Sequence, residues 1–172
     1  GDSTLIMHGL EYHWANQTLY GGSNGNLYQI DAPTGVATLI GSSGFGSFVN
    51  LVYVPGTNTM YATVNGTSTA TTQDSWYSVD VTTGIFTFIG TYAPAATNIN
   101  GLAYDLDNDT IYAVDNSTDL LYSVDRSTGG VTGASGSAMS NCAKAMRPWY
   151  WRRRFTTYRW CEFSGSSPRR RR

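Results

Sequence analysis

The sequence is poor in charge, and over most of its length it lacks cysteine and lysine. Only 13% of its 172 residues are Asp, Glu, Lys or Arg, which argues against long helices with charged faces. Both cysteines, Cys142 and Cys161, lie near the C-terminus, so residues 1–140 can form neither a disulfide nor a thiolate metal site. No apolar run approaches the ~18 residues that a transmembrane helix requires, and no membrane span is expected.

The sequence also lacks the motifs that usually carry catalysis. It contains no Gly-x-Ser-x-Gly elbow, no His-Glu-x-x-His pair and no phosphate-binding loop. The only histidines, His8 and His13, have no cysteine or paired carboxylate beside them, and we interpret them as structural or surface residues. The acidic run 105–109 fails as an EF-hand loop, because Thr110 and Asn116 stand where Gly and Glu are required. We therefore predict a protein that is not an enzyme and binds no cofactor or metal.

Charge is divided between two regions. Residues 1–140 hold eleven acidic side chains and one basic side chain, Arg126, a net charge near −10. Residues 141–172 hold ten basic side chains and one acidic side chain, Glu162, a net charge near +9. An acidic, lysine-free body rich in Thr and Asn is typical of secreted or cell-surface proteins, and the start at Gly1 without Met suggests a mature form.

What the sequence does contain is a threefold repeat, at about residues 5–41, 48–90 and 98–133. In each copy two tyrosines lie 8 residues apart. A third tyrosine follows them and begins the motif Tyr-x-x-Asp-x-x-Thr-Gly. The first tyrosines are Tyr12, Tyr53 and Tyr104, the second are Tyr20, Tyr61 and Tyr112, and the third are Tyr28, Tyr77 and Tyr122. Constant spacing in three copies indicates a structural repeat.

Each copy predicts four short antiparallel strands joined by tight turns. Asn-rich and Gly-rich segments separate the strands, and in the Asp-x-x-Thr-Gly turn Gly supplies a positive φ while Asp caps the turn. Apolar residues alternate onto both faces of each strand, as expected when sheets stack face to face. The predicted fold is all-β, with about three four-stranded blades of the β-propeller type and their nine repeat tyrosines packed between blades.

The stretch 19–35, Leu-Tyr-Gly-Gly-Ser-Asn-Gly-Asn-Leu-Tyr-Gln-Ile-Asp-Ala-Pro-Thr-Gly, resembles blades of bacterial secreted β-propellers of the quinoprotein and YVTN types. The resemblance covers residues 9 to about 133 and implies blade architecture rather than a particular chemistry. The Trp of the fourth strand in quinoprotein repeats is replaced by Leu39-Ile40-Gly41 and Phe88-Ile89-Gly90. No quinone cofactor is therefore expected.

Residues 141–172 do not follow the repeat and form a basic, Trp- and Arg-rich tail outside the domain at 1–140. A fourth blade is due near residue 145, and a one-base shift would let the codons of 147–154 encode a Gly-rich strand. We favour the interpretation that the tail is an out-of-frame or artefactual remnant of that blade. A functional basic tail for polyanions and an ordered C-terminus are the alternatives, and nucleic acid is not an expected partner.

Two groups of residues are candidates for surface chemistry. Trp14 and Trp76 could stack on sugar rings, Trp76 because it follows the insertion in the second copy. Four Asn-x-Ser/Thr sequons in predicted loops are candidates for glycosylation, at Asn16, Asn65, Asn108 and Asn116.

These observations lead to two hypotheses on function. In the first, the protein is an extracellular structural or interaction protein whose blades self-associate into an oligomer or filament, because three blades alone leave faces and edges that other subunits would cover. In the second, it is a lectin-like module that binds glycans.

Overall fold

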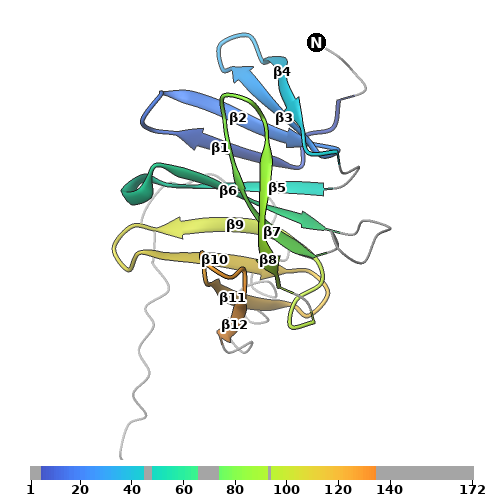
Figure 1. Cartoon of the computed structure of the whole chain (residues 1–172), viewed down its shortest axis with the longest axis vertical. Helices are drawn as coiled ribbons and strands as arrows, with labels where there is room; N and C mark the ends of the chain where they lie inside the picture. Colours follow the sequence, from blue (N-terminus) through green and yellow to red (C-terminus); the bar gives the residue numbers. More distant parts are fainter. Residues whose placement is uncertain (1–4, 45–47, 66–73, 93, 135–172) are drawn as a thin grey trace, which may run out of the picture.

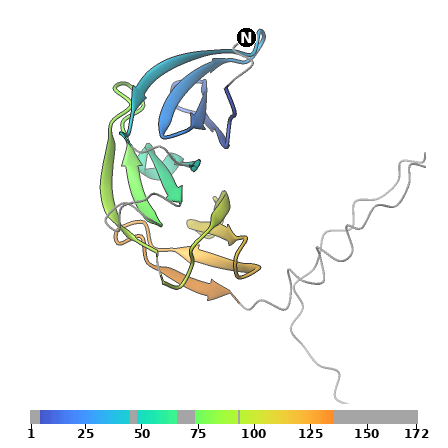
Figure 2. The same ribbon diagram turned by 90° about the vertical axis from the view of Figure 1, so that its right-hand side faces the viewer.

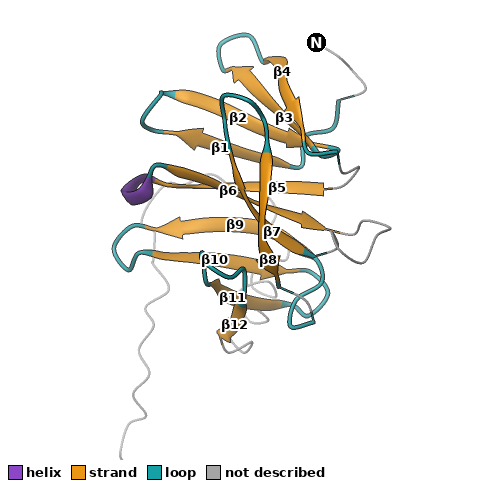
Figure 3. Cartoon of the chain, viewed as in Figure 1, coloured by secondary structure: helices purple, strands orange, loops and turns teal. Residues whose placement is uncertain are grey.

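The computed structural model describes residues 5–44, 48–65, 74–92 and 94–134, and the predictions on the basic tail lie outside these residues. In the described part, twelve strands form three separate four-stranded antiparallel sheets, which confirms the predicted all-β fold of propeller-type blades. The one helical element there is a short 3₁₀ turn, η1 (Pro55–Thr57), shown in purple in Figure 3. The described residues hold no helix with the length and hydrophobicity needed to cross a lipid bilayer.

Each sheet is one blade, with its strands in sequence order. Blade 1 contains β1 (Gly9–His13), β2 (Thr18–Ser23), β3 (Asn26–Asp31) and β4 (Val36–Ser42). Blade 2 contains β5 (Phe48–Val54), β6 (Thr59–Asn65), β7 (Ser75–Val79) and β8 (Phe86–Thr91). Blade 3 contains β9 (Ile99–Asp105), β10 (Thr110–Asp115), β11 (Leu120–Val124) and β12 (Val131–Ala134).

The Asp-x-x-Thr-Gly turn joins the third and fourth strands of every blade, as predicted. Its glycines, Gly35, Gly84 and Gly129, have φ of 71°, 71° and 73°, a region that other residues enter only with strain. Each glycine donates its N–H to the carbonyl of the turn's Asp, at 2.7 to 2.8 Å. The repeat is therefore fixed by local turn chemistry in each blade.

The three blades stack side by side in an open arc (Figures 1 and 2). Contacts between the first strands, β1 with β5 and β5 with β9, hold neighbouring blades together. The fourth strands lie toward the convex side of the arc in Figure 2. Each blade thus has an N-side face, turned toward the preceding position in the stack, and a C-side face, turned toward the following one.

Alternation along the strands builds one apolar core at each contact between blades. Interface 1, between blades 1 and 2, buries the C-side residues Tyr20 and Leu27 against the N-side residues Leu51, Tyr53, Met60, Ala62, Val64, Tyr77 and Val79. Interface 2, between blades 2 and 3, buries the C-side residues Val52, Val54 and Trp76, with the loop residues Tyr92 and Ala96, against Ile99, Ile111, Ala113, Tyr122 and Val124. Along β5, β6 and β7, both faces of the middle blade are therefore covered by a neighbouring blade.

Pairs of glycines bring the outer edges of the blades into close contact. A side chain at Gly41 at the end of β4 would overlap the turn carbonyl of Thr83, and one at Gly84 would overlap the backbone of Gly41. The same arrangement recurs in interface 2, where a side chain at Gly90 would overlap the carbonyl of Thr128. Glycine is required here because two backbones touch.

Candidate functional site

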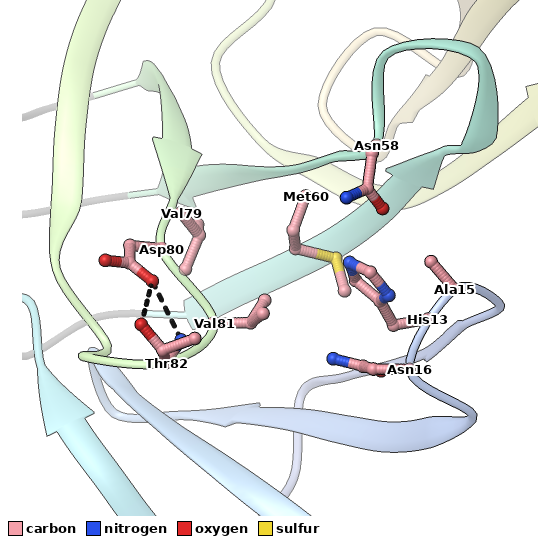
Figure 4. Close-up of a pocket in the computed structure, with 9 residues that line it drawn as sticks. All are labelled: His13, Ala15, Asn16, Asn58, Met60, Val79, Asp80, Val81 and Thr82. Atoms are coloured by element: carbon pink, nitrogen blue, oxygen red, sulfur yellow. Dashed lines mark hydrogen bonds between the residues drawn. The ribbon is translucent and has the colours of Figure 1, made fainter.

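A cleft of about 390 Å³ opens at one end of interface 1, where the two blades diverge (Figure 4). Blade 1 contributes the end of β1 and the β1–β2 turn, and blade 2 contributes the β5–β6 turn, the start of β6 and the turn after β7. The lining residues are His13, Ala15, Asn16, Asn58, Met60, Val79, Asp80, Val81 and Thr82. This volume lies at the small end of the range for ligand pockets, ~300–1,000 Å³.

His13 is the buried polar group of the cleft. Its side chain is only 5% exposed, its ring packs on the Tyr53 ring at 4.0 Å between centroids, and the Tyr20 ring meets it edge-on at 6.1 Å. Burial lowers the pKa of His13 below its ordinary value of 6.5, so the imidazole is neutral at pH 7. Its Nδ1 atom is buried without a hydrogen-bond partner in the described protein, a state that costs ~1–3 kcal/mol.

The same two tyrosines hold two amide side chains at the mouth of the cleft. The Asn16 Nδ2 donates to the Tyr20 hydroxyl at 2.8 Å, and the Tyr53 hydroxyl donates to the Asn58 Oδ1 at 2.7 Å. In Figure 4 the two amides lie on either side of the His13 ring, with the Met60 thioether beside it. The hydrogen bonds fix the orientation of the amides before any ligand arrives.

Asp80 lies across the cleft from His13 (Figure 4) and is held by its own turn. Its carboxylate accepts hydrogen bonds from the Thr82 hydroxyl at 2.7 Å and the Thr82 N–H at 2.8 Å. These bonds, the hydroxyl first, hold the pKa of Asp80 at about 2. The far wall of the cleft is therefore ionised throughout the physiological pH range.

The equivalent place in interface 2 carries an ion pair. There Arg126 stands at the repeat position of Val81 and Asp109 at that of Asn58, and the two form a salt bridge at 2.8 Å. The Tyr104 hydroxyl donates to Asp109 at 2.7 Å, as Tyr53 does to Asn58. The two places thus share the tyrosine bond to the β-turn residue, and they differ in the side chains at the positions of Asn58 and Val81.

A second candidate surface is the N-side face of blade 1. This face of blades 2 and 3 packs against the preceding blade, and blade 1 has Leu10, Tyr12, Leu19, Gly21, Tyr28 and Ile30 at the same positions. Leu10 is 57% exposed and Tyr12 is 38% exposed. Met7 lies on the same face, since a side chain at Gly21 would meet its sulfur. An apolar sheet face of this kind marks an interaction surface.

The structure places the two predicted stacking residues differently. Trp14 is 68% exposed and packs edge-on against Tyr12, with ring centroids 5.1 Å apart. Trp76 is fully buried in interface 2, where its ring stacks on Tyr61 and its Nε1 donates to the Arg126 carbonyl at 3.3 Å. The expectation that Trp76 offers a face to a sugar is therefore corrected, because the neighbouring blade covers that face.

Three of the four sequons lie in exposed turns, at Asn16, Asn108 and Asn116. The fourth, Asn65, is buried, and its Nδ2 donates to the Ile99 carbonyl at 2.5 Å. A glycan attached to that nitrogen would require interface 2 to open, so the prediction for Asn65 is corrected. The acidic turn that begins at Asp105 is held by hydrogen bonds from the backbone of 107 and 108, and no group of three metal-ligating residues occurs in the described part of the chain.

Sequence reasoning did not find the cleft, because its residues come from two blades and carry no motif. Its signal was present in the repeat alignment, where His13 and Val81 stand at the positions of Val54 and Arg126. A polar residue that replaces an apolar one at a buried repeat position marks a place where the interface differs.

Comparison with known proteins gives matches among solved structures alone. No protein-family model matches the chain, and no curated protein matches it significantly. Among solved structures, auxiliary nutrient binding proteins of Bacteroides thetaiotaomicron and Bacteroides ovatus are similar, with 18% and 16% identity over 73% of this chain and TM-scores of 0.48 and 0.47. A candidate 6-phosphogluconolactonase of Bacteroides fragilis shows 14% identity over 74% of this chain and a TM-score of 0.48.

This chain spans about a third of the length of these solved structures, 35% to 37%. The four-stranded sheets confirm the predicted resemblance to β-propellers at the level of the blade. They do not distinguish the quinoprotein or YVTN type from other propellers.

Proposed function

We propose that this chain is a non-enzymatic, extracellular interaction protein whose blades associate head to tail with those of other copies. The single observation that supports this most strongly is the N-side face of blade 1. Its residues occupy positions that pack against a preceding blade in both interfaces of the chain. The occupant we assign to this face is a second copy, through the C-side face of its blade 3.

The C-side face of blade 3 has the matching repeat positions. Tyr112 and Leu121 correspond to Tyr20 and Leu27, which are buried in interface 1, and both are only partly buried. Blade 3 has Ala134 opposite Leu121, where the other blades have Gly41 and Gly90 opposite their equivalents. The glycine contact of the outer edge is therefore not reproduced, and we expect association weaker than the two interfaces within the chain.

An interface between two different faces of the same protein is heterologous and leads to rings or to open fibres. Burial of the apolar N-side face supplies the driving force, at ~25 cal/mol per Å² of apolar surface. The acidic, lysine-free composition of residues 1–140 and the exposed sequons away from the cleft, at Asn108 and Asn116, support a place outside the cell.

Light scattering on the full chain tests the proposal. Salt near 1 M shortens the Debye length to about 3 Å, so that attraction between the acidic body and the basic tail cannot produce a false assembly. We expect a mass that rises with concentration above the 18.7 kDa of one chain. The apparent dissociation constant of the assembly should be at least tenfold higher for Leu10→Lys than for the wild type.

The matched control is Leu106→Lys, since Leu106 is 71% exposed but lies in the β9–β10 turn, away from the N-side face. This variant should assemble like the wild type. A wild type that stays at 18.7 kDa, or a Leu10→Lys variant that assembles normally, would overturn the proposal.

A further inference from the structure

We infer that the cleft of interface 1 is a binding site for a small, neutral, polyhydroxylated ligand, such as a monosaccharide or the end of a glycan. This site is independent of the head-to-tail association and shares no residue with either end face. Three features support it: the buried imidazole of His13, the two fixed amides of Asn16 and Asn58, and the contrast with interface 2.

The first step concerns His13. A neutral imidazole nitrogen that is buried without a partner is an acceptor or donor in need of a hydrogen-bonding group. His13 Nδ1 is such an atom, and the ring cannot turn freely because Tyr53 and Tyr20 pack on it. Nδ1 has almost no exposed surface, so a ligand hydroxyl reaches it only with a small shift of the ring or of a neighbouring side chain, and would then remove the cost of its missing hydrogen bond.

The second step concerns the polar groups around the mouth. Asn16 and Asn58 each use one amide atom in a bond to a tyrosine hydroxyl, and the other atom of each amide remains at the cleft. Amides both donate and accept, as the hydroxyl groups of sugars do. Oriented amides, an imidazole and apolar walls from Val79 and Val81 are the composition expected of a small-molecule site.

The third step concerns charge, which selects among ligands. Asp80 is ionised, and residues 1–140 carry eleven acidic side chains against one arginine, so the field repels anions. In interface 2 a cation fills the same place, but there its partner is the carboxylate of Asp109. Asn58 is neutral, so the cleft lacks the carboxylate that holds Arg126 in interface 2. Asp80 already accepts two hydrogen bonds from Thr82. A neutral ligand that is rich in hydroxyl groups fits what remains.

The fourth step is the comparison between the interfaces. In interface 2 Arg126 and Asp109 form an ion pair at this place, whereas the equivalent residues of interface 1, Val81 and Asn58, line the cleft. The tyrosine bond to the turn residue is the same in both. The residues of interface 2 can therefore be copied into interface 1 to fill the cleft. The double variant Asn58→Asp with Val81→Arg would rebuild the Asp109–Arg126 pair in interface 1.

The experiment follows the imidazole ¹⁵N signals of the full chain by NMR. Only two histidines occur, His8 and His13, so both are resolved and His8 is the internal reference. D-glucose, D-galactose and N-acetyl-D-glucosamine are the probes, titrated to several times the ~1 mM dissociation constant of a weak site. We expect a saturable shift of His13 with at least one sugar, no shift of His8, and at least a tenfold weaker response in the double variant.

If the double variant does not fold, Val81→Phe fills the same space without a buried charge and should give the same loss. Leu10→Lys should bind the sugar normally, which separates this inference from the proposed association. Absence of a His13 shift with all three sugars, or a shift that persists in a folded variant with a filled cleft, would overturn the inference.

Discussion

The two interfaces of this chain are built on one repeat but are sealed to different degrees. In interface 2 the fully buried Trp76 fills the core, and Arg126 forms a salt bridge with Asp109 at the end. In interface 1 the position of Trp76 is held by Leu27, and the end is open beside His13. The difference shows that repeat positions set which residues meet, whereas the residue at each position sets whether the contact is closed or keeps room for a ligand.

A polar network adds to the closure of interface 2. Asn50 and Asn65 both donate from Nδ2 to the Ile99 carbonyl, at 2.8 and 2.5 Å. The Tyr92 hydroxyl donates to the Asn65 Oδ1 and lies 3.2 Å from the Val64 carbonyl. Buried and mutually satisfied groups of this kind fix one arrangement of the packed elements, so we expect blades 2 and 3 to separate less readily than blades 1 and 2.

The largest effect should follow Trp76→Ala. Loss of a fully buried Trp leaves a cavity between blades 2 and 3, and such changes lower the free energy of unfolding by ~3–5 kcal/mol. Urea denaturation followed by circular dichroism measures it. Trp14→Ala is the matched control, because the exposed Trp14 lies outside both cores, and it should change stability by less than ~0.5 kcal/mol. Equal losses in the two variants would contradict the comparison.

A smaller but substantial effect is expected from Gly90→Ala. The added methyl group would overlap the Thr128 carbonyl in the next blade, and forcing atoms into a packed contact costs ~1–3 kcal/mol. Gly101→Ala adds the same group where nothing lies within 4 Å, and it should leave the denaturation midpoint unchanged. If Gly90→Ala is equally neutral, the blades do not touch at this point.

The smallest effect concerns His13 and the pH. Burial lowers its folded-state pKa below 6.5, so the unfolded chain takes up a proton at a higher pH than the folded chain does. The contribution of His13 to stability is therefore complete above about pH 6.5 and is lost as the pH falls below it. In blade 2 the position of His13 is held by Val54. The variant His13→Val should therefore remain packed and lose this pH dependence of stability.

Denaturation of the wild type and His13→Val from pH 7.5 to pH 5 checks this prediction. Other acidic groups near the ring, Glu11 on the same strand and Asp80 across the cleft, are present in both proteins. Burial raises the pKa of Glu11, which opposes the trend, but this contribution cancels in the difference between the two proteins. Parallel pH profiles would show that His13 does not titrate as a buried group.

The sequence predicts the blades well because they are local. The Tyr spacing and the Asp-x-x-Thr-Gly turn act within one copy, and positive φ at Gly35, Gly84 and Gly129 confirms the turn. What could not be predicted depends on contact between copies. Trp76 lies in a strand with apolar residues on both faces, and only the docking of blade 3 shows that its ring is covered. The cleft likewise joins His13 and Asn58 across two blades, and no single repeat contains it.

The measurement that tests the central claim most directly is side-chain footprinting of the full chain at low and high protein concentration in high salt. Head-to-tail association predicts that Leu10 and Tyr12 of blade 1 and Tyr112 and Leu121 of blade 3 become protected together as the concentration rises, while Leu106 does not. If neither face gains protection, or if blade 1 gains it alone, the blades do not continue from one copy to the next and the account is wrong.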